Sequence, residues 1–244
     1  MPTADKILET DGLTKQFGRL YALRSVSTSV AGGEFVAVFG RNGAGKTTFL
    51  RIISSLVRSY SGTVKLFGQD LKKTGEDTRR RIGFLSHDSF LYKDLSVLDN
   101  LVFYAKLYRV RSLNDRVDNL LERVGLEIKR NKPVRTLSRG MKQRLSLARV
   151  FLHQPQFLLM DEPYTGLDEE ACERLDGLLS EFVLAGGAIV LTTHNISRGL
   201  KHAHRIVVFD RGRIVHESKA GELGVDEFQD LYKEMIFRPT GTQS

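Results

Sequence analysis

The chain has 244 residues, and its 37 Lys and Arg residues against 29 Asp and Glu residues give a formal net charge of +8. This positive charge is compatible with nucleic acid or an anionic membrane surface as a partner. Its composition, 41% hydrophobic and 27% charged, argues against a disordered chain, and its apolar runs are far shorter than the roughly 20 residues that span a bilayer. Charged residues near the start argue against a secretory signal, and the single Cys172 excludes an intramolecular disulfide framework and favours a reducing compartment.

The first third of the chain predicts short strands around one helix. Residues 34–39 form an apolar run that ends at a glycine, residues 62–68 alternate between two turn glycines, and residues 82–85 form another short apolar run. Residues 46–57 between these runs predict a helix.

The middle third predicts a helical lobe over about residues 88–150. Apolar residues within 98–108 recur at i, i+3, i+4, i+7 and i+10, which is typical of an amphipathic helix. Ser96, three residues before Asp99, suits the start of that helix, and the apolar pattern repeats over residues 117–124.

The last third predicts buried parallel strands that alternate with helices. Three apolar runs lack the alternation of a half-exposed strand, which indicates that both of their faces are covered: residues 157–160, 188–191 and 206–209. Helical patterns lie between and after these runs: residues 169–184, 196–202 and 225–237.

Residues 40–47 match the phosphate-loop motif G-x-x-x-x-G-K-[ST], between a predicted strand and a predicted helix. Its glycines let backbone N–H groups surround a phosphate, and the helix that follows directs its positive N-terminus at the anion. Lys46 suits the terminal phosphates and Thr47 suits Mg²⁺, so we expect ATP and Mg²⁺ here rather than an ordinary glycine-rich turn. The residues expected to contact the nucleotide are Gly40, Arg41, Asn42, Gly43, Ala44, Gly45, Lys46, Thr47 and Thr48.

Two carboxylates end the apolar run at 157–160. Asp161 at the end of a buried strand can hold Mg²⁺ beside the phosphate loop, and Glu162 then suits polarising the attacking water. A strand that ends in two carboxylates is common, so this hypothesis depends on its pairing with the phosphate loop.

Residues 137–144, L-S-R-G-M-K-Q-R, resemble the L-S-G-G-Q signature of ATP-binding cassette (ABC) ATPases and lie in the expected order between the phosphate loop and the Asp-Glu strand. The resemblance covers roughly residues 6–217. It implies an α/β fold: a P-loop NTPase core with a mainly parallel sheet, an antiparallel N-terminal β-subdomain and an inserted α-helical subdomain. The implied division of a single ABC ATPase domain is a catalytic core of residues 1–87 and 151–217, a helical subdomain of residues 88–150 and a C-terminal tail of residues 218–244.

The resemblance also implies that two cassettes pair head to tail, as a homodimer or with another cassette. Ser138 and Gly140 of one copy would then cap the γ-phosphate held by the other, although Arg139 and Met141 depart from the common Gly and Gln. Residues 166–168 resemble the D-loop that bridges the cassettes.

Three further residues receive roles only through the resemblance. His194 is expected to be the switch histidine at the γ-phosphate, and Phe17, with Tyr21 as a less suitable substitute, takes the place of the adenine-stacking aromatic. His87 stands where the family has its Q-loop glutamine. Because Mg²⁺ prefers oxygen ligands, we expect His87 to contact the metal weakly and to act mainly in coupling to the membrane partner.

Within this family, three features resemble the ATP-binding subunit of the haem exporter of cytochrome c maturation: His87, the aromatic Tyr164 after Asp-Glu-Pro, and Gly186-Gly187. A general exporter of drugs, lipids or polysaccharides is the alternative. In either case the predicted function is ATP hydrolysis that drives export through an integral membrane permease, from the cytoplasmic face of the membrane.

Two other classes of protein share some of these features. A P-loop kinase has no use for the signature segment or for His194. ABC proteins that act on ribosomes or DNA usually carry two cassettes or a long coiled coil, which this chain lacks, so no nucleic-acid partner is expected. The basic clusters at 79–81 and 129–135 are then interpreted as solvated faces or as an attraction to an anionic leaflet.

Overall fold

The structure is a computed structural model that describes residues 5–111 and 113–237. Two β-sheets form the body of the protein. The smaller sheet is antiparallel, in the order β2-β1-β4-β5: β1 (Lys6–Phe17), β2 (Leu20–Ala31), β4 (Ser61–Leu66) and β5 (Gln69–Asp70). The register of the long β1–β2 hairpin shifts at several points. These shifts interrupt the alternation of apolar and polar residues along the hairpin, so the sequence pattern does not show where its two strands begin and end. The alternation at residues 62–68 does predict the strand that the structure shows as β4.

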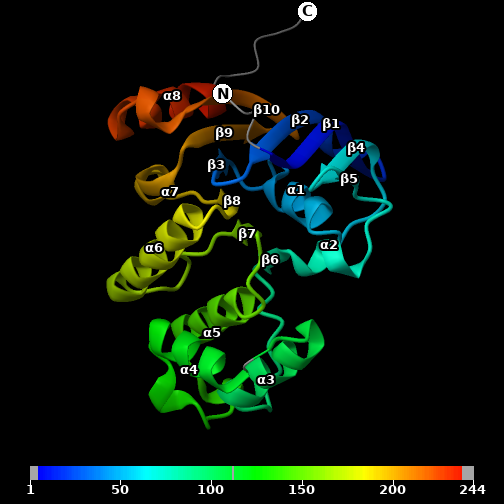
Figure 1. Cartoon of the computed structure of the whole chain (residues 1–244). Coiled ribbons are helices and arrows are strands. Elements are labelled where there is room, and N and C mark those ends of the chain that lie inside the picture. The colour runs from blue at the N-terminus through cyan, green and yellow to red at the C-terminus, as the bar shows by residue number, and fades with distance from the viewer. Residues whose placement is uncertain (1–4, 112, 238–244) are drawn as a thin grey trace, which may run out of the picture.

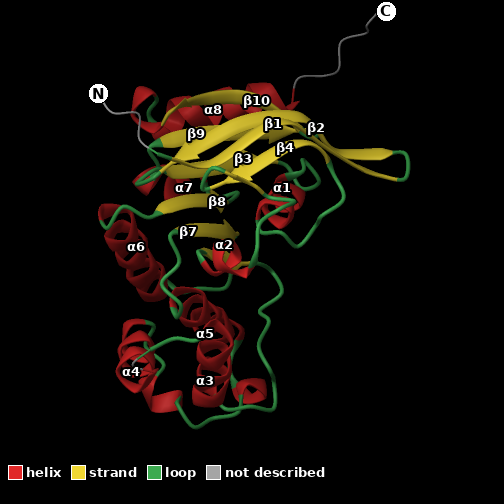
Figure 2. Ribbon diagram, turned by 45° about the vertical axis from the view of Figure 1, so that its right-hand side comes forward, coloured by secondary structure: helices red, strands yellow, loops and turns green. Residues whose placement is uncertain are grey.

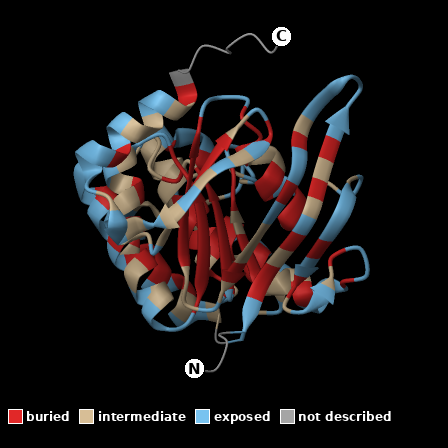
Figure 3. Cartoon of the chain, turned by 90° about the horizontal axis from the view of Figure 1, so that it is seen from above, coloured by how far each residue is buried: buried red, intermediate tan, exposed pale blue. Residues whose placement is uncertain are grey.

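The larger sheet is mainly parallel, in the order β10-β9-β3-β8-β7-β6, and only β9 and β10 pair antiparallel. Its strands are β3 (Phe35–Gly40), β6 (Ile82–Leu85), β7 (Phe157–Asp161), β8 (Ala188–Thr192), β9 (Arg205–Asp210) and β10 (Arg213–Lys219). Residues 157–160 of β7, 188–191 of β8 and 206–209 of β9 are all buried, which confirms the prediction of strands covered on both faces, and every residue of β3 is buried as well. Figure 3 shows these strands buried along their length, whereas the hairpin alternates.

Helix α1 (Lys46–Ile53) lies between the two sheets (Figure 1). Its buried Phe49 belongs to one hydrophobic cluster with Leu8 of β1 and Val38 of β3. The helix ends four residues before the predicted end at residue 57, because Ser55 adopts a left-handed φ of +65° that an α-helix does not allow. The short α2 (Glu76–Arg80) precedes β6.

Three helices in the last third cover the parallel sheet: α6 (Glu169–Leu184), α7 (Ile196–His202) and α8 (Val225–Phe237). All three have the predicted bounds. Asp168 and Asn195 cap α6 and α7 by accepting hydrogen bonds from backbone N–H groups in the first turn. The Phe228 ring of α8 packs 5.1 Å from that of Phe39 in β3. A 3₁₀ turn at Ala220–Glu222 precedes α8.

A helical lobe extends away from the sheets (Figures 1 and 2). Its elements are α3 (Val97–Tyr108), α4 (Leu113–Arg123), α5 (Arg139–Phe151) and the 3₁₀ turns Glu127–Lys129 and Val134–Thr136. Helix α5 joins this lobe to the core, because Leu145 and Ala148 belong to the lobe's hydrophobic cluster while Leu147 and Val150 pack with the strands. Within the described residues, no helix is long and apolar enough to cross a membrane.

Candidate active site

The phosphate loop connects β3 to α1 and depends on glycine at two positions. Gly40 has a φ of +149°, and a Cβ there would lie 2.4 Å from the carbonyl oxygen of Phe209. Gly45 has a φ of +108°, and its Cβ would lie 2.4 Å from the carbonyl oxygen of Ala22. A side chain at either position would therefore push the loop away from its neighbours and distort the anion-binding backbone.

The Lys46 side chain is folded over this loop and is buried. Its Nζ donates to the carbonyl oxygens of Gly40, at 2.6 Å, and of Arg41, at 3.1 Å. Burial lowers the pKa of Lys46, and the nearby carboxylates of Glu162 and Asp161 oppose that shift. The charge of Lys46 is thus held at the loop, where an incoming triphosphate would place its terminal phosphates.

A second polar group gathers around Asp161 at the end of β7. The Oγ1 atom of Thr47 donates to Asp161 Oδ2 at 2.8 Å, and the Oγ1 atom of Thr192 donates to Asp161 Oδ1 at 2.6 Å. The parallel register of β7 and β8 aligns Asp161 with Thr192. His87 Nε2 lies 3.7 Å from Asp161 Oδ2, so the structure places the predicted Q-loop residue at this carboxylate.

The oxygen atoms of Thr47 and Asp161 fit Mg²⁺, which binds through one or two carboxylates together with substrate phosphates. The nitrogen of His87 suits the ion less well. Residues 5–111 and 113–237 contain no group of three or more His, Cys, Asp or Glu side chains that could hold a metal ion by themselves. The donors therefore suit an ion that arrives with a phosphate ligand.

A third pair joins the ends of β7 and β8. His194 Nδ1 lies 2.9 Å from Glu162 Oε2, and the backbone N–H of His194 points at the same oxygen from 3.4 Å. Glu162 adopts a left-handed φ of +54°, a conformation that is rare outside glycine and concentrates at functional sites. Its side chain is mostly buried whereas that of His194 is exposed, so the pair lies at the edge of the solvent.

These three groups meet around one cavity of about 490 Å³. It is lined by residues 41–48, which include most of the phosphate loop, and by Ala22, His87, Asp161, Glu162, Thr165 and His194. A smaller cavity of about 340 Å³ shares Asp161 and Glu162 with it and extends toward Arg139 and Gln143 of α5. A larger groove of about 1350 Å³ opens at the opposite ends of the parallel strands, beside Gln156 and Gly187, and contains none of the predicted site residues.

Four predicted residues do not line the cavity of this chain: Gly40, which ends β3, and three residues from other segments. Ser138 caps α5 by accepting a hydrogen bond from Met141 N. A Cβ on Gly140 would lie 2.7 Å from the carbonyl oxygen of Gly166, so the signature segment packs against the segment that resembles a D-loop. Phe17 is exposed at the end of β1, with Lys15 Nζ 4.5 Å from its ring centre.

Two lining or supporting residues were not predicted. Thr192 is fully buried and its hydroxyl donates to Asp161. It directly follows the apolar run 188–191, as Asp161 follows the run 157–160, so pairing the two predicted strands in parallel would have placed the two residues side by side. Gln143 of α5 donates to the carbonyl oxygen of Pro163 at 2.9 Å, which links the signature helix to the residue after Glu162. That contact between distant segments has no motif in the sequence.

A family model described as "ABC transporter" matches residues 23–165. The chain belongs to the ABC transporter family. It is 35% identical, over 98% of this chain and 76% of the relative, to the daunorubicin resistance ATP-binding protein DrrA3 of Streptomyces coeruleorubidus. It is 36% identical to the Nod factor export ATP-binding protein I of Cupriavidus metallidurans, over 89% of this chain and 72% of the relative, and 32% identical to the arginine transport ATP-binding protein ArtM of Bacillus subtilis, over 88% and 92%.

Solved structures agree with this ABC assignment. The ATP-binding subunit of an ABC transporter superposes with a TM-score of 0.86 at 27% identity, over 94% of this chain and 99% of that one. The cassette MJ0796, in a dimeric post-hydrolysis state bound to ADP and Pi, gives 0.80 at 28% identity, over 87% and 98%. These matches confirm the predicted fold class and show that the chain is an ATP-binding, ATP-hydrolysing cassette that uses Mg²⁺.

Proposed function

We propose that this chain is the ATP-hydrolysing subunit of an ABC exporter, that it pairs with a second cassette, and that it works against a membrane permease at the cytoplasmic face. One observation carries the proposal: the phosphate loop, the Thr47–Asp161 pair and the Glu162–His194 pair surround a single cavity. Hydrolysis of a γ-phosphate needs positive charge, ligands for Mg²⁺ and a base for the attacking water. The phosphate loop with Lys46 supplies the charge, Thr47 and Asp161 supply the ligands, and Glu162 with His194 supplies the base.

In this proposal each side chain has one task. The loop N–H groups and Lys46 neutralise the phosphates, and Thr47 and Asp161 hold Mg²⁺, which when bound spreads the charge of the phosphate oxygens. Glu162 accepts a proton from the attacking water. His194, bonded to Glu162, holds that carboxylate in place and contacts the γ-phosphate.

Pairing with a second copy is supported by the position of the signature. Ser138 lies at the N-terminus of the 13-residue helix α5 but does not line the cavity of its own chain. A helix N-terminus suits an anion, and a second chain facing the cavity can present it there. We therefore propose that Ser138 and Gly140 complete the site of the opposite copy and that Phe17 stacks on adenine. We also propose that each copy has the expected division into catalytic core, helical subdomain and C-terminal tail.

A docking surface for the permease is supported by exposed apolar side chains beside the segment that follows His87. They are Phe90, Tyr92, Leu95, Phe103 and Leu107. The rings of Tyr92 and Phe103 are 4.8 Å apart, so part of this surface is contiguous. Exposed apolar clusters mark interaction sites. Because His87 lies next to Asp161, a partner seated there would be coupled to the nucleotide through that residue.

The transported molecule is proposed from the relatives. Two of the three named above act in drug resistance or Nod factor export, which favours export of an organic molecule. Haem is the second candidate, supported by His87, Tyr164 and Gly186-Gly187. Two of these features also have structural roles: Tyr164 donates to Asp176, and a Cβ on Gly187 would lie 2.3 Å from the Phe182 ring, so neither requires haem.

Transport by the reconstituted complex tests the proposal. The tagged chain is used to isolate its membrane subunit from detergent-solubilised membranes, and the pair is placed in proteoliposomes with the cassette outside. We expect ATP-dependent uptake of daunorubicin into the vesicles, and no uptake when the Lys46→Ala chain replaces the native one. Uptake of haem alone would select the second candidate, and an ATP-dependent loss of solute from the lumen would overturn export.

A further inference from the structure

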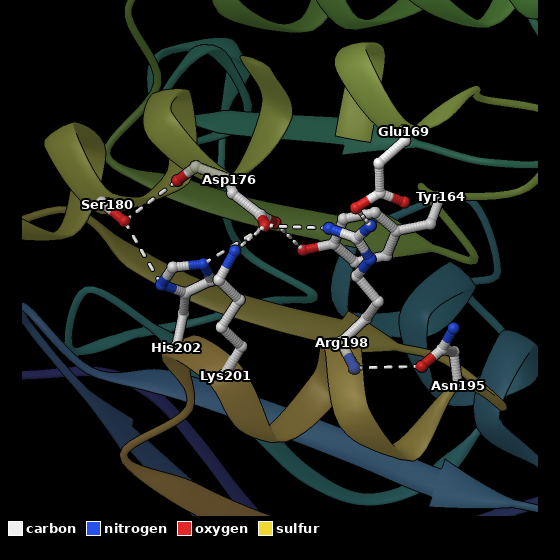
Figure 4. Close-up of polar contacts among 8 residues, drawn as sticks. All are labelled: Tyr164, Glu169, Asp176, Ser180, Asn195, Arg198, Lys201 and His202. Atoms are coloured by element: carbon white, nitrogen blue, oxygen red, sulfur yellow. Dashed lines mark hydrogen bonds and ion pairs between the residues drawn. The ribbon is translucent and has the colours of Figure 1, made fainter. Parts of the chain in front are cut away.

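A cluster of charged side chains surrounds the carboxylate of Asp176, in the middle of α6 (Figure 4). The Tyr164 hydroxyl donates to Asp176 Oδ1 at 2.8 Å. Lys201 Nζ and the Arg198 guanidinium donate to Oδ2 at 2.7 Å and 3.1 Å, and His202 Nε2 lies 3.6 Å from the same oxygen. Only 5% of the Asp176 side chain is exposed, so these contacts replace nearly all of its water.

The carboxylate is charged in this setting. Burial by itself would raise the pKa of Asp176, but hydrogen bonds from Lys201 and Tyr164 and the nearby charges of His202 and Lys201 outweigh burial and lower the pKa. Burial and the bond to Asp176 raise the pKa of Tyr164, so its hydroxyl remains a donor. A buried charge is costly unless its partners keep their geometry, so this cluster resists displacement.

One arm of the cluster leads to the catalytic carboxylate. Tyr164 comes two residues after Glu162, in a turn closed by a hydrogen bond from Thr165 N to the Glu162 carbonyl oxygen at 3.2 Å. The turn is anchored on β8, because Glu162 N donates to the carbonyl oxygen of Thr192 at 3.0 Å. A shift of the Tyr164 ring would therefore be felt two residues away, at Glu162.

The other arm leads to the histidine. Arg198 lies in the first turn of α7, and its backbone N–H donates to Asn195 Oδ1 at 3.0 Å. Asn195 directly follows His194, so the residue that caps α7 is the neighbour of the histidine in the chain. The 2.9 Å contact from His194 to Glu162 closes a ring that runs from Glu162 through Asp176 and back.

The Arg198 guanidinium also binds Glu169, the first residue of α6 after the segment that resembles a D-loop, and its centre lies 5.7 Å from the Tyr164 ring centre. The cluster thus ties together the three chain segments that follow Glu162, Asp168 and His194. Stability alone does not require ions here, because well-packed apolar residues replace buried ion pairs at little or no cost.

We propose that Asp176 is a positioning residue for ATP hydrolysis, which through Tyr164 and Arg198 holds Glu162 and His194 in register. The proposal rests on the proposed role of Glu162. A misplacement of about 1 Å at a catalytic group costs about 100-fold in rate. Loosening the ring should therefore lower kcat by about 10- to 100-fold and leave nucleotide affinity unchanged, since neither Asp176 nor Tyr164 lines the nucleotide cavity.

Three variants of the full chain test this. Tyr164→Phe removes one hydroxyl and keeps the ring, and Asp176→Asn keeps an oxygen acceptor and removes the charge. Glu173→Gln is the matched control, since the Glu173 side chain is exposed on the same helix and makes no hydrogen bond or ion pair among the residues that the structure describes. Thermal unfolding checks that each variant is folded, and Tyr164→Phe decides the test if Asp176→Asn is not.

The measurements are kcat for Mg-ATP hydrolysis and the Kd for a fluorescent ATP analogue, with Glu162→Gln assayed in parallel. We expect Tyr164→Phe to lose about tenfold or more in kcat with Kd within about twofold of native, and Glu173→Gln to behave as native. The positioning role is overturned if folded Tyr164→Phe turns over within twofold of native while Glu162→Gln is inactive, or if kcat falls only in proportion to weaker ATP binding. Native turnover by Glu162→Gln would instead overturn the role proposed for Glu162 and, with it, this proposal.

Discussion

Replacing Thr192 by Val isolates the hydrogen bond that holds Asp161 from β8. The two residues face each other in register, Thr192 is fully buried, and its Oγ1 donates to Asp161 Oδ1 at 2.6 Å. Valine keeps the branched shape and removes the donor, which leaves one oxygen of a nearly buried carboxylate without that partner. A hydrogen bond to a charged group contributes about 1.5–3 kcal/mol, so we expect a loss of about 2 kcal/mol in the free energy of unfolding.

For a chain of this size, 2 kcal/mol corresponds to a decrease of about 4–8 °C in Tm. The assay is thermal unfolding without nucleotide, followed by hydrolysis at increasing Mg²⁺ with ATP fixed. We expect the half-maximal Mg²⁺ concentration to rise, because Asp161 is then held by Thr47 alone among its hydroxyl donors. Thr63→Val, at an exposed position of β4, is the control and should change stability by less than about 0.5 kcal/mol. A Tm within 1 °C of native together with an unchanged Mg²⁺ requirement would refute the reasoning.

Two further predictions concern stability. Burial, reinforced by the charges of neighbouring arginines, lowers the pKa of His153 from its ordinary 6.5 to about 4, so the protein should lose about 2 kcal/mol of stability between pH 7 and pH 5, as the unfolded chain takes up the proton first. His153→Gln should flatten that dependence in urea unfolding, and an unchanged slope would contradict the buried neutral histidine. Gly187→Ala should cost about 1–3 kcal/mol, because its Cβ would meet the Phe182 ring, whereas Gly177→Ala, with open space around it in α6, should gain about 0.5–1 kcal/mol. Equal effects of the two alanines in thermal unfolding would contradict the packing argument.

The elements that sequence predicted best are those with local signals. Helices α6 and α7 begin directly after the capping residues Asp168 and Asn195, and the buried strands of the parallel sheet are plain apolar runs. Helix α1 was predicted too long because the left-handed turn at Ser55 has no glycine to mark it. The β1–β2 hairpin was not delimited because its register shifts hide the alternation.

The residues of the candidate site also differ in whether a local sequence signal predicts them. Motifs point to the phosphate loop, Asp161 and Glu162, because their spacing along the chain is fixed by one strand and one turn. Thr192 and Asp176 act through pairing and packing between residues that lie 12 to 31 positions apart, and no local pattern encodes such contacts. The resemblance to a family supplied His194, whereas a lone histidine after a strand would not have been chosen from physics alone.

The central claim is that Glu162 performs hydrolysis in a site that a second copy completes. Glu162→Gln removes the base but keeps an oxygen near His194, so ATP should still bind. We predict that this variant loses about 10²- to 10⁴-fold in turnover and, with Mg-ATP, elutes with the mass of two 27.5 kDa chains in light scattering, whereas the same variant carrying Ser138→Arg stays a monomer. Hydrolysis at the native rate, or a single-chain mass with saturating Mg-ATP, would contradict the account.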